Sequence, residues 1–192
     1  MKKIILASKS PRRIEMMKDN GFDPAVMPAD IDETLPFDMK PEASVMYLAL
    51  KKAAHVADLY APDPAAADTY TVIAADTVVV YEGRIIGKPQ DAEEAFDILS
   101  KLCGKCHHVI TGVCIISTEE TGVSKKCFYD KTAVFFKDYS DEELARYVET
   151  DEPYDKAGGY AIQGTFGKYV HHIEGNLDNV IGFPWKMIRS YL

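Results

Sequence analysis

The chain has 192 residues, 47% of them hydrophobic, which is enough to bury a core without disulfide or metal support. Its 22 lysines and arginines against 30 aspartates and glutamates give a formal net charge of −8, which argues against a surface that coats nucleic acid. The four cysteines are few for this length and no secretory leader pattern precedes them, so we expect reduced thiols and a cytoplasmic location. The apolar runs are shorter than the ~20 residues that a membrane span needs.

Hydrophobic periodicity and turn residues predict an alternation of strands and helices. We predict, in chain order, a strand at 3–7, helices at 12–20 and 41–60, strands at 71–81 and 84–86, a helix at 92–102, strands at 108–117 and 123–136, a helix at 141–150, a strand at 168–173 and a helix at 185–192. This order is typical of an α/β fold, and the two long adjacent strands favour a mixed sheet over a purely parallel one.

The stretch Ser8-Lys9-Ser10-Pro11-Arg12-Arg13 joins the first strand to the first helix. Ser10 is a favourable helix N-cap and Pro11 a favourable first helical residue, so both arginines fall in the first turn. Cations are unfavourable there, because a helix N-terminus carries about half a positive charge, and a bound anion would remove the conflict. On this stretch alone, a solvated strand-to-helix turn is the alternative.

Acidic residues mark two further candidate positions. Asp76 lies in the apolar run VIAADTVVV, where a carboxylate is costly to bury unless it faces a cleft, pairs with a cation or binds a metal. A structural aspartate that accepts backbone N–H groups is the alternative. Thr77 points to the other side of a regular strand, although a bend would let both line one pocket. The acidic loop 30–34 is either solvated or able to hold Mg²⁺ through one or two carboxylates.

Lysines and glycines give weaker signals. Lys51 and Lys52 lie about 140° and about 120° from the centre of the apolar helix face, which is too similar for periodicity to choose between them. Lys88 precedes a proline in a hairpin loop and suits a phosphate, although exposed loop lysines are common. The Gly-rich segment 155–164 could bring backbone close to a ligand, with Gln163 able to donate and accept toward a base edge.

The segment Cys103-Gly104-Lys105-Cys106 has the spacing of a metal or redox pair. No second C-x-x-C follows it and a strand is predicted directly after it, so ordinary packing is the favoured interpretation. The sequence also has no Walker A loop, no dinucleotide-binding glycine motif and no nucleophile elbow. Nothing in it therefore requires a covalent intermediate.

Eight short motifs in one order resemble those of the Maf family of nucleoside triphosphate pyrophosphatases. They are LASKSPRR, DET, KKA, AADTVV, GKP, HHVITGV, EPYDKAGGYAIQG and NVIGFP, and they extend from Leu6 to Pro184. Small differences from the usual motifs, which are Lys9 in place of glycine, Phe183 in place of leucine and an additional glycine at Gly159, leave the charged site residues unchanged. The resemblance implies a single Maf-like domain over residues 1–192, with two lobes around a central mixed β-sheet flanked by helices and the active site in the cleft, an architecture shared with inosine triphosphatases.

The resemblance also implies an activity, the hydrolysis of a nucleoside triphosphate between its α and β phosphates with a divalent cation (Mg²⁺, Mn²⁺ or Co²⁺). Catalysis of this kind depends mainly on positioning and charge stabilisation. The implied roles are triphosphate binding by Ser8, Arg13, Lys52 and Lys88, general base catalysis by Asp76, and metal binding by Glu33 and Asp76.

Substrate choice rests on three residues. Arg12, Thr77 and Gln163 match the pattern of family members that act on dTTP and UTP, with modified pyrimidine nucleotides as further candidates. The family also implies a homodimer and a house-cleaning role in the nucleotide pool, with a link to cell-division arrest. Two alternatives stay open: a purine-directed enzyme that prefers dITP or XTP, and a nucleotide-binding division regulator that has lost turnover.

Overall fold

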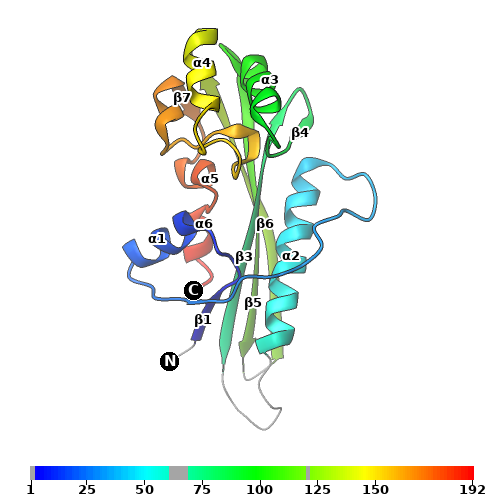
Figure 1. Cartoon of the computed structure of the whole chain (residues 1–192). Coiled ribbons are helices and arrows are strands. Elements are labelled where there is room, and N and C mark those ends of the chain that lie inside the picture. The colour runs from blue at the N-terminus through cyan, green and yellow to red at the C-terminus, as the bar shows by residue number, and fades with distance from the viewer. Residues whose placement is uncertain (1–2, 61–68, 120–121) are drawn as a thin grey trace. The chain divides into compact units, whose positions relative to one another are not determined.

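The computed structural model describes residues 3–60, 69–119 and 122–192. Figure 1 shows its elements, which in chain order are β1 (Lys3–Leu6), α1 (Pro11–Asp19), β2 (Ala25–Val26), α2 (Pro41–Tyr60), β3 (Tyr70–Tyr81), β4 (Arg84–Ile86), α3 (Ala92–Leu102), β5 (Cys106–Glu119), β6 (Gly122–Phe136), α4 (Asp141–Val148), the 3₁₀ helices η1 (Ala157–Gly159) and η2 (Thr165–Tyr169), β7 (Val170–Glu174), α5 (Leu177–Ile181) and α6 (Trp185–Arg189). In the part of the chain that is described, no helix combines the length and apolarity needed to cross a membrane.

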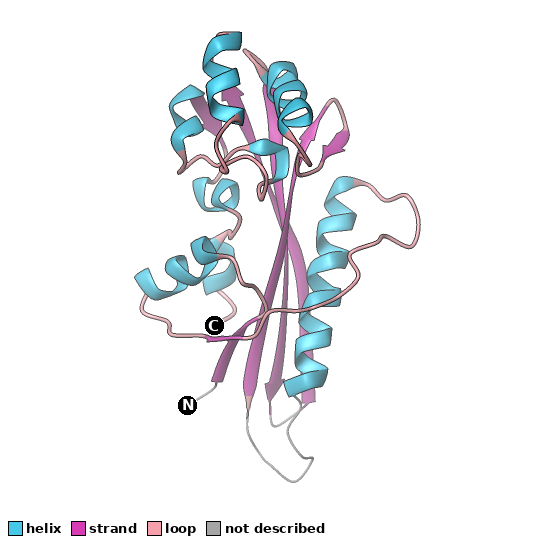
Figure 2. Ribbon diagram, viewed as in Figure 1, coloured by secondary structure: helices cyan, strands magenta, loops and turns pink. Residues whose placement is uncertain are grey.

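The strands form one mixed sheet in the order β2-β1-β3-β5-β6-β7, and β4 pairs with β3 outside this path. β1 runs parallel to both β2 and β3, whereas the β3–β4 and β6–β7 pairs are antiparallel. Figure 2 shows these strands with helices around them. The α/β class and the central mixed sheet predicted from the sequence are therefore confirmed.

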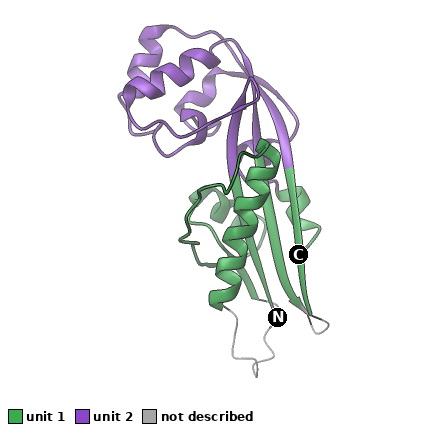
Figure 3. Ribbon diagram, turned by 90° about the vertical axis from the view of Figure 1, so that its right-hand side faces the viewer, with its two compact units in different colours: residues 1–76, 111–129, 185–192 green, residues 77–110, 130–184 purple. Residues whose placement is uncertain are grey.

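The chain divides into two compact units, coloured separately in Figure 3. Unit 1 comprises residues 1–76, 111–129 and 185–192, and unit 2 comprises residues 77–110 and 130–184. The polypeptide therefore passes from one unit to the other within β3, within β5, within β6 and directly before α6. The active-site cleft between two lobes and the single domain over residues 1–192 stay predictions.

The core of unit 1 forms where α2 packs against the sheet. The facing positions of the helix are mostly small, with Ala49, Ala53 and Ala57 spaced by four residues along one face, so the helix axis can lie close to the strands. The buried members of this core are Ile5, Ala7, Ala49, Ala53, Val56, Ala57, Tyr70, Val72, Ala74, Cys114 and Ile116. The helix that carries Lys51 and Lys52 is thus held by close packing along its length.

Gly112 of β5 lies directly against the backbone of α2. A Cβ atom at this position would lie 2.5 Å from the carbonyl oxygen of Val45 and 2.6 Å from the amide nitrogen of Met46. Because both are backbone atoms, a change of rotamer cannot relieve the overlap. The glycine of the HHVITGV motif is therefore required by the close approach of α2.

We expect Gly112→Ala to lower the free energy of unfolding by about 1–3 kcal/mol, the usual cost of overpacking a core. Urea denaturation followed by circular dichroism measures this change. Gly87→Ala is the matched control, because a Cβ atom at Gly87 meets no atom within 4 Å, and it should change the free energy by less than about 0.5 kcal/mol. Equal and small changes in both variants would contradict this role of Gly112.

Unit 2 has a core rich in aromatic side chains. Its buried members are Val79, Ala95, Ile98, Leu99, Leu102, Val109, Val134, Phe136, Leu144, Tyr147, Val148, Tyr160, Phe166 and Tyr169. The two long helices on this core begin as predicted. The Asp91 side chain accepts a hydrogen bond from the Glu94 amide at the start of α3, and Ser140 and Glu143 form a capping box at the start of α4.

One predicted strand starts later than expected. Residues 165–169 form the 3₁₀ helix η2, and β7 begins only at Val170, whereas the sequence predicted a strand from residue 168. Phe166 and Tyr169 are both buried in the aromatic core. They are three residues apart, and this spacing is the period of a 3₁₀ helix. Tertiary packing of these two rings therefore overrides the local strand preference.

The short helix α5 was not predicted from the sequence. The Asn176 side chain caps it by accepting a hydrogen bond from the Asp178 amide, and Gly182, in the left-handed conformation, ends it. Both capping residues are readable in the sequence, but only five residues separate them, which is too few for a helical period to show. At the C-terminus, α6 ends at Arg189, before the predicted end at residue 192.

His107 of β5 is fully buried in the core of unit 2. Its Nε2 atom lies 2.6 Å from the hydroxyl oxygen of Tyr160, and its ring packs 4.8 Å from the ring of Phe136. The Nδ1 atom has no hydrogen-bond partner among the residues that are described. Burial lowers the pKa of His107 to about 3, so the imidazole is neutral in the folded protein near neutral pH.

The buried imidazole predicts an acid-sensitive fold. An unfolded histidine has a pKa of about 6.5, so between about pH 6.5 and about pH 3 the unfolded chain binds more protons at this residue than the folded chain does. The stability that His107 contributes in its neutral form is fully present above this window and decreases as the pH falls through it, by up to about 1.4 kcal/mol per pH unit. Urea unfolding of the wild type and His107→Gln at several pH values measures the difference in slope. Identical slopes in the two proteins would contradict the prediction.

Candidate active site

Asp76 is paired with Lys52 in unit 1. Strand β3 carries the aspartate and helix α2 carries the lysine, whose Nζ atom lies 2.7 Å from Asp76 Oδ1 and 2.8 Å from Glu33 Oε1. The side chains of Asp76 and Lys52 are each 12% exposed, whereas that of Glu33 is 58% exposed. Of the ways in which an apolar strand can accommodate a carboxylate, pairing with a cation is the one observed here.

The acidic loop is tethered to α2 by both lysines. Lys52 makes the ion pairs, and Lys51 instead donates a hydrogen bond to the backbone carbonyl of Asp32. The Asp32 carboxylate accepts a hydrogen bond from the Thr34 amide at 2.9 Å, and its bonds with Thr34 lower the pKa of Asp32. The structure thus separates two lysines that periodicity could not, and it places Glu33 beside Lys52.

Arg13 lies beside this ion pair. Its Nη1 atom donates hydrogen bonds to Ser8 Oγ at 3.1 Å and to the backbone carbonyl of Ala75 at 2.8 Å. Burial lowers the pKa of Arg13 to about 10, and the charge of Asp76 acts in the opposite direction, so the guanidinium stays a cation at neutral pH. Ser8 and Arg13 are therefore close to each other, as their predicted shared role requires. The β3 residue to which Arg13 bonds, Ala75, directly precedes Asp76.

The first turn of α1 contains the electrostatic conflict inferred from the sequence. Ser10 occupies the N-cap and Pro11 the first turn, as predicted, but the Ser10 side chain makes no capping hydrogen bond. The Ser8 hydroxyl instead accepts a hydrogen bond from the Ser10 amide at 3.3 Å. Arg12 is half-buried, and its charge lowers the pKa of Arg13 further. Two neighbouring cations thus meet at a helix N-terminus, where an anion would be stabilised.

The predicted site residues Thr77, Lys88 and Gln163 belong to unit 2. Thr77 is half-buried on β3, and both Lys88 and Gln163 are exposed. The loop before Lys88 is bonded to the Gly-rich segment, because the Gly87 carbonyl accepts a hydrogen bond from the Gly158 amide at 2.9 Å. The loops that carry the two exposed residues are thus connected through their backbones.

Glu152, which the sequence analysis did not single out, closes the loop that carries Gln163. Its carboxylate accepts hydrogen bonds from the Thr165 amide at 3.0 Å and from the Thr165 hydroxyl at 2.7 Å. Gly164 makes room for this contact, since a Cβ atom there would lie 2.9 Å from Glu152 Cδ. The glutamate stands in the EPYDKAGGYAIQG motif, but its spacing from Gln163 carries no recognisable signal. Loop closure of this kind becomes visible only in the fold.

The carboxylates of Asp76 and Glu33 suit a divalent cation. Mg²⁺ takes oxygen ligands and is usually held by one or two carboxylates together with water and substrate phosphates. Asp76 and Glu33 both reach one ammonium group, Lys52 Nζ, so their oxygens converge on one small volume. Among the described residues, no group of three or more His, Cys, Asp or Glu side chains is placed to hold a metal. The donor set therefore fits a site in which Asp76 and Glu33 supply two ligands and water and substrate phosphates supply the others, better than a site with three or more protein ligands.

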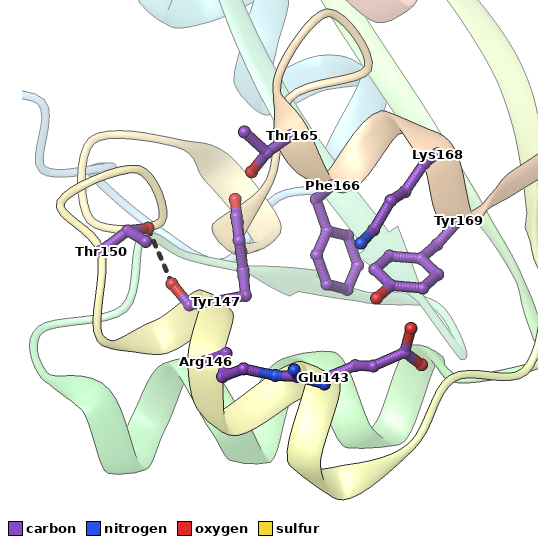
Figure 4. Close-up of a pocket in the computed structure, with 8 residues that line it drawn as sticks. All are labelled: Glu143, Arg146, Tyr147, Thr150, Thr165, Phe166, Lys168 and Tyr169. Carbon is purple, nitrogen blue, oxygen red and sulfur yellow. Dashed lines mark hydrogen bonds between the residues drawn. The ribbon is translucent and has the colours of Figure 1, made fainter.

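Unit 2 also contains a surface pocket of about 450 Å³ beside α4 and η2, shown in Figure 4. The rings of Tyr147, Phe166 and Tyr169 line it, and the Lys168 Nζ atom lies 4.7 Å from the centre of the Tyr169 ring. None of the site residues predicted from the sequence is among those that line this pocket. The predicted chemistry therefore rests on the cluster around Asp76 and not on this pocket.

Comparisons with known proteins decide the family. A family model described as Maf-like protein matches residues 3–192. The chain belongs to the Maf family. Two curated relatives with the name dTTP/UTP pyrophosphatase illustrate the similarity. The protein from Caldicellulosiruptor bescii is 46% identical over 184 residues, which are 96% of this chain and 90% of the relative. The protein from Pelotomaculum thermopropionicum is 44% identical over 194 residues, which cover 100% of this chain and 96% of the relative.

A solved structure, that of the Staphylococcus aureus Ham1 protein, resembles the fold of this Maf family member. The TM-score is 0.51 and the sequence identity 17%, with 99% of this chain and 97% of the other covered. At this identity the likeness concerns the fold alone. It agrees with the mixed sheet flanked by helices, whereas the family assignment rests on the sequence matches.

Proposed function

We propose that this Maf family member is a nucleoside triphosphate pyrophosphatase that hydrolyses dTTP and UTP to the monophosphate and pyrophosphate. The observation that carries the proposal is the cluster in unit 1, where a mostly buried Asp76–Lys52 pair is joined by Glu33 and flanked by Arg13. The names of relatives 42–46% identical to this chain support both the reaction and the substrates.

The cluster supplies the two requirements of phosphoryl transfer, charge neutralisation and a positioned base. Arg13 and Ser8 would bind phosphate oxygens, and Lys52 and Lys88 would neutralise the triphosphate. The Asp76 carboxylate would accept a proton from the attacking water, and its low exposure strengthens its electrostatic interactions by limiting access of bulk water. A divalent cation bound to Glu33 and Asp76 would add positive charge at the phosphates.

Base selection is assigned to Arg12, Thr77 and Gln163 on the family pattern. The Gln163 amide can both donate and accept hydrogen bonds, so it can distinguish base edges that differ in donors and acceptors. The bonds of Glu152 with Thr165 fix the end of the loop that presents it.

A screen of all common and several modified NTPs and dNTPs, with Mg²⁺ or Mn²⁺ and with pyrophosphate release as the readout, tests the proposal. We expect dTTP and UTP to give the highest kcat/KM. Preference for dITP or XTP would favour the purine-directed alternative, and nucleotide binding without any pyrophosphate would favour a regulator that has lost turnover. The homodimer, the cytoplasmic location and the link to cell-division arrest stay predictions, and sedimentation velocity tests the first of them.

A further inference from the structure

The C-x-x-C pair of the sequence does not form a thiol pair in the structure. All four cysteines are free thiols. Cys103 Sγ accepts a hydrogen bond from the Tyr139 amide at 3.3 Å and lies 3.5 Å from the Tyr139 carbonyl oxygen, to which it donates, whereas Cys106 Sγ donates to the His107 carbonyl at 3.8 Å. Each of the two sulfurs is therefore engaged with a different backbone group.

A second pair, Cys114 and Cys127, lies in unit 1 on the neighbouring strands β5 and β6. Where β5 begins and β6 ends, the Phe136 amide donates a hydrogen bond to the Lys105 carbonyl at 3.0 Å. Cys114 lies nine residues after Lys105 and Cys127 nine residues before Phe136, so this register places the two cysteines opposite each other. The neighbouring Cys127 raises the pKa of the Cys114 thiol, in agreement with this register.

Opposite positions on antiparallel strands suit a disulfide. Their Cα atoms are about 4.5–5.5 Å apart, and disulfides join residues whose Cα atoms are about 4.4–6.8 Å apart. At this Cα separation, an S–S bond can form through side-chain rotation without displacement of either strand. Unlike the C-x-x-C pair, this pair thus has the geometry of a redox couple.

The two thiols differ in accessibility. Cys127 is exposed, and Cys114 is buried in the core that α2 covers. Burial raises the pKa of the Cys114 thiol, and contact with Cys127 raises it further, while the charge of Lys125 acts in the opposite direction. Lys125 stands two residues before Cys127 and so lies on the same face of β6. An oxidant therefore reaches Cys127 first, and Cys114 is placed to react with the product.

We propose that Cys114 and Cys127 form an intrachain disulfide when the folded protein is exposed to a peroxide. The Cys127 thiolate attacks one oxygen of hydrogen peroxide, the O–O bond breaks, and after proton transfer Cys127 sulfenic acid and one water are formed. The Cys114 sulfur then attacks the Cys127 sulfur, the S–O bond breaks, and the hydroxyl leaves as a second water with the Cys114 proton. The two thiols lose two electrons and two protons, and one peroxide is reduced to two waters.

Peroxide treatment of the full chain, followed by alkylation, tryptic digestion and mass spectrometry, tests this. Lys125 and Lys126 separate the two cysteines after digestion, but Cys106 and Cys114 share the tryptic peptide 106–125. A variant with Cys103→Ser and Cys106→Ser leaves only one link to form. We expect peptide 106–125 joined to peptide 127–131 with the loss of two hydrogens, both in this variant and in the wild type, where Cys103 and Cys106 stay open to alkylation.

Cys114→Ala is the matched control, since it removes the second thiol and leaves the exposed Cys127 in place. In this variant we expect Cys127 to accumulate as sulfinic acid at peroxide concentrations that give the disulfide in the wild type. Three outcomes would overturn the proposal: a Cys127 that stays alkylatable in the wild type, a Cys127 oxidised to sulfinic acid while Cys114 stays free, or a link that joins other cysteines in preference. The wild type and the double serine variant decide among these outcomes even where Cys114→Ala folds poorly.

Discussion

Asp76→Asn is expected to abolish release of pyrophosphate while leaving nucleotide binding largely intact. An amide has nearly the size of a carboxylate but cannot take a proton from water, so the variant loses the general base, an effect typically worth 10²–10⁴-fold in rate. Arg13, Ser8 and Lys52 keep their positive or polar groups, and Lys52 keeps its ion pair with Glu33. The measurements are kcat for dTTP from pyrophosphate release and Kd for dTTP from isothermal titration calorimetry.

The matched control is Asp23→Asn, which removes the same charge from an exposed position of unit 1. It should leave kcat and Kd close to those of the wild type. A kcat near the wild-type value in Asp76→Asn would remove Asp76 from the role of base. Loss of binding together with turnover would show instead that Asp76 is needed to assemble the nucleotide site.

Lys52→Met is expected to lower kcat/KM for dTTP by about 10²-fold or more, the effect of removing one preorganised charge that stabilises the transition state. Methionine keeps the apolar stem in the core but removes the ammonium group. It also leaves the carboxylates of Asp76 and Glu33 near each other without the cation between them, so we expect a lower Tm as well. Steady-state kinetics and thermal denaturation measure the two effects.

Lys51→Met controls for the loss of a lysine on the same helix. Its ammonium group donates to the Asp32 carbonyl and not to a carboxylate of the cluster, so we expect a smaller loss of kcat/KM. Equal losses in both variants would mean that tethering of the acidic loop, and not the charge of Lys52, controls the reaction. Near-normal activity in both Lys52→Met and Lys88→Ala would leave the proposed binding of the triphosphate by lysines without support.

The parts of the fold that could be predicted depend on local chemistry. Asp91 and Ser140 mark helix starts because a short polar side chain satisfies free backbone N–H groups. The 3₁₀ helix η2 could not be predicted in this way. Its shape is set by burial of Phe166 and Tyr169 among aromatic rings from distant parts of the chain.

The site could be predicted as a set of residue types but not as a set of pairs. Sequence reasoning left four explanations for Asp76 and two candidates for the lysine, because a strand pattern does not say what faces it and a 20° difference on a helix does not select a neighbour. The fold selects Lys52 by packing α2 onto β5, and Gly112 sets how close that packing can be. The same limit applies to the cysteines, where sequence spacing pointed to one pair and strand register brings together another.

The chain passes from unit 1 to unit 2 between Asp76 and Thr77. The proposed base therefore belongs to one packing unit, and the next residue, proposed to help select the nucleobase, belongs to the other together with Gln163. Unit 2 thus carries two of the three residues proposed for base selection, Thr77 and Gln163, and unit 1 carries the third, Arg12, together with the Asp76–Lys52 pair. Substitutions at Thr77 or Gln163 would therefore alter nucleotide preference without replacing a residue of the unit that holds the proposed base.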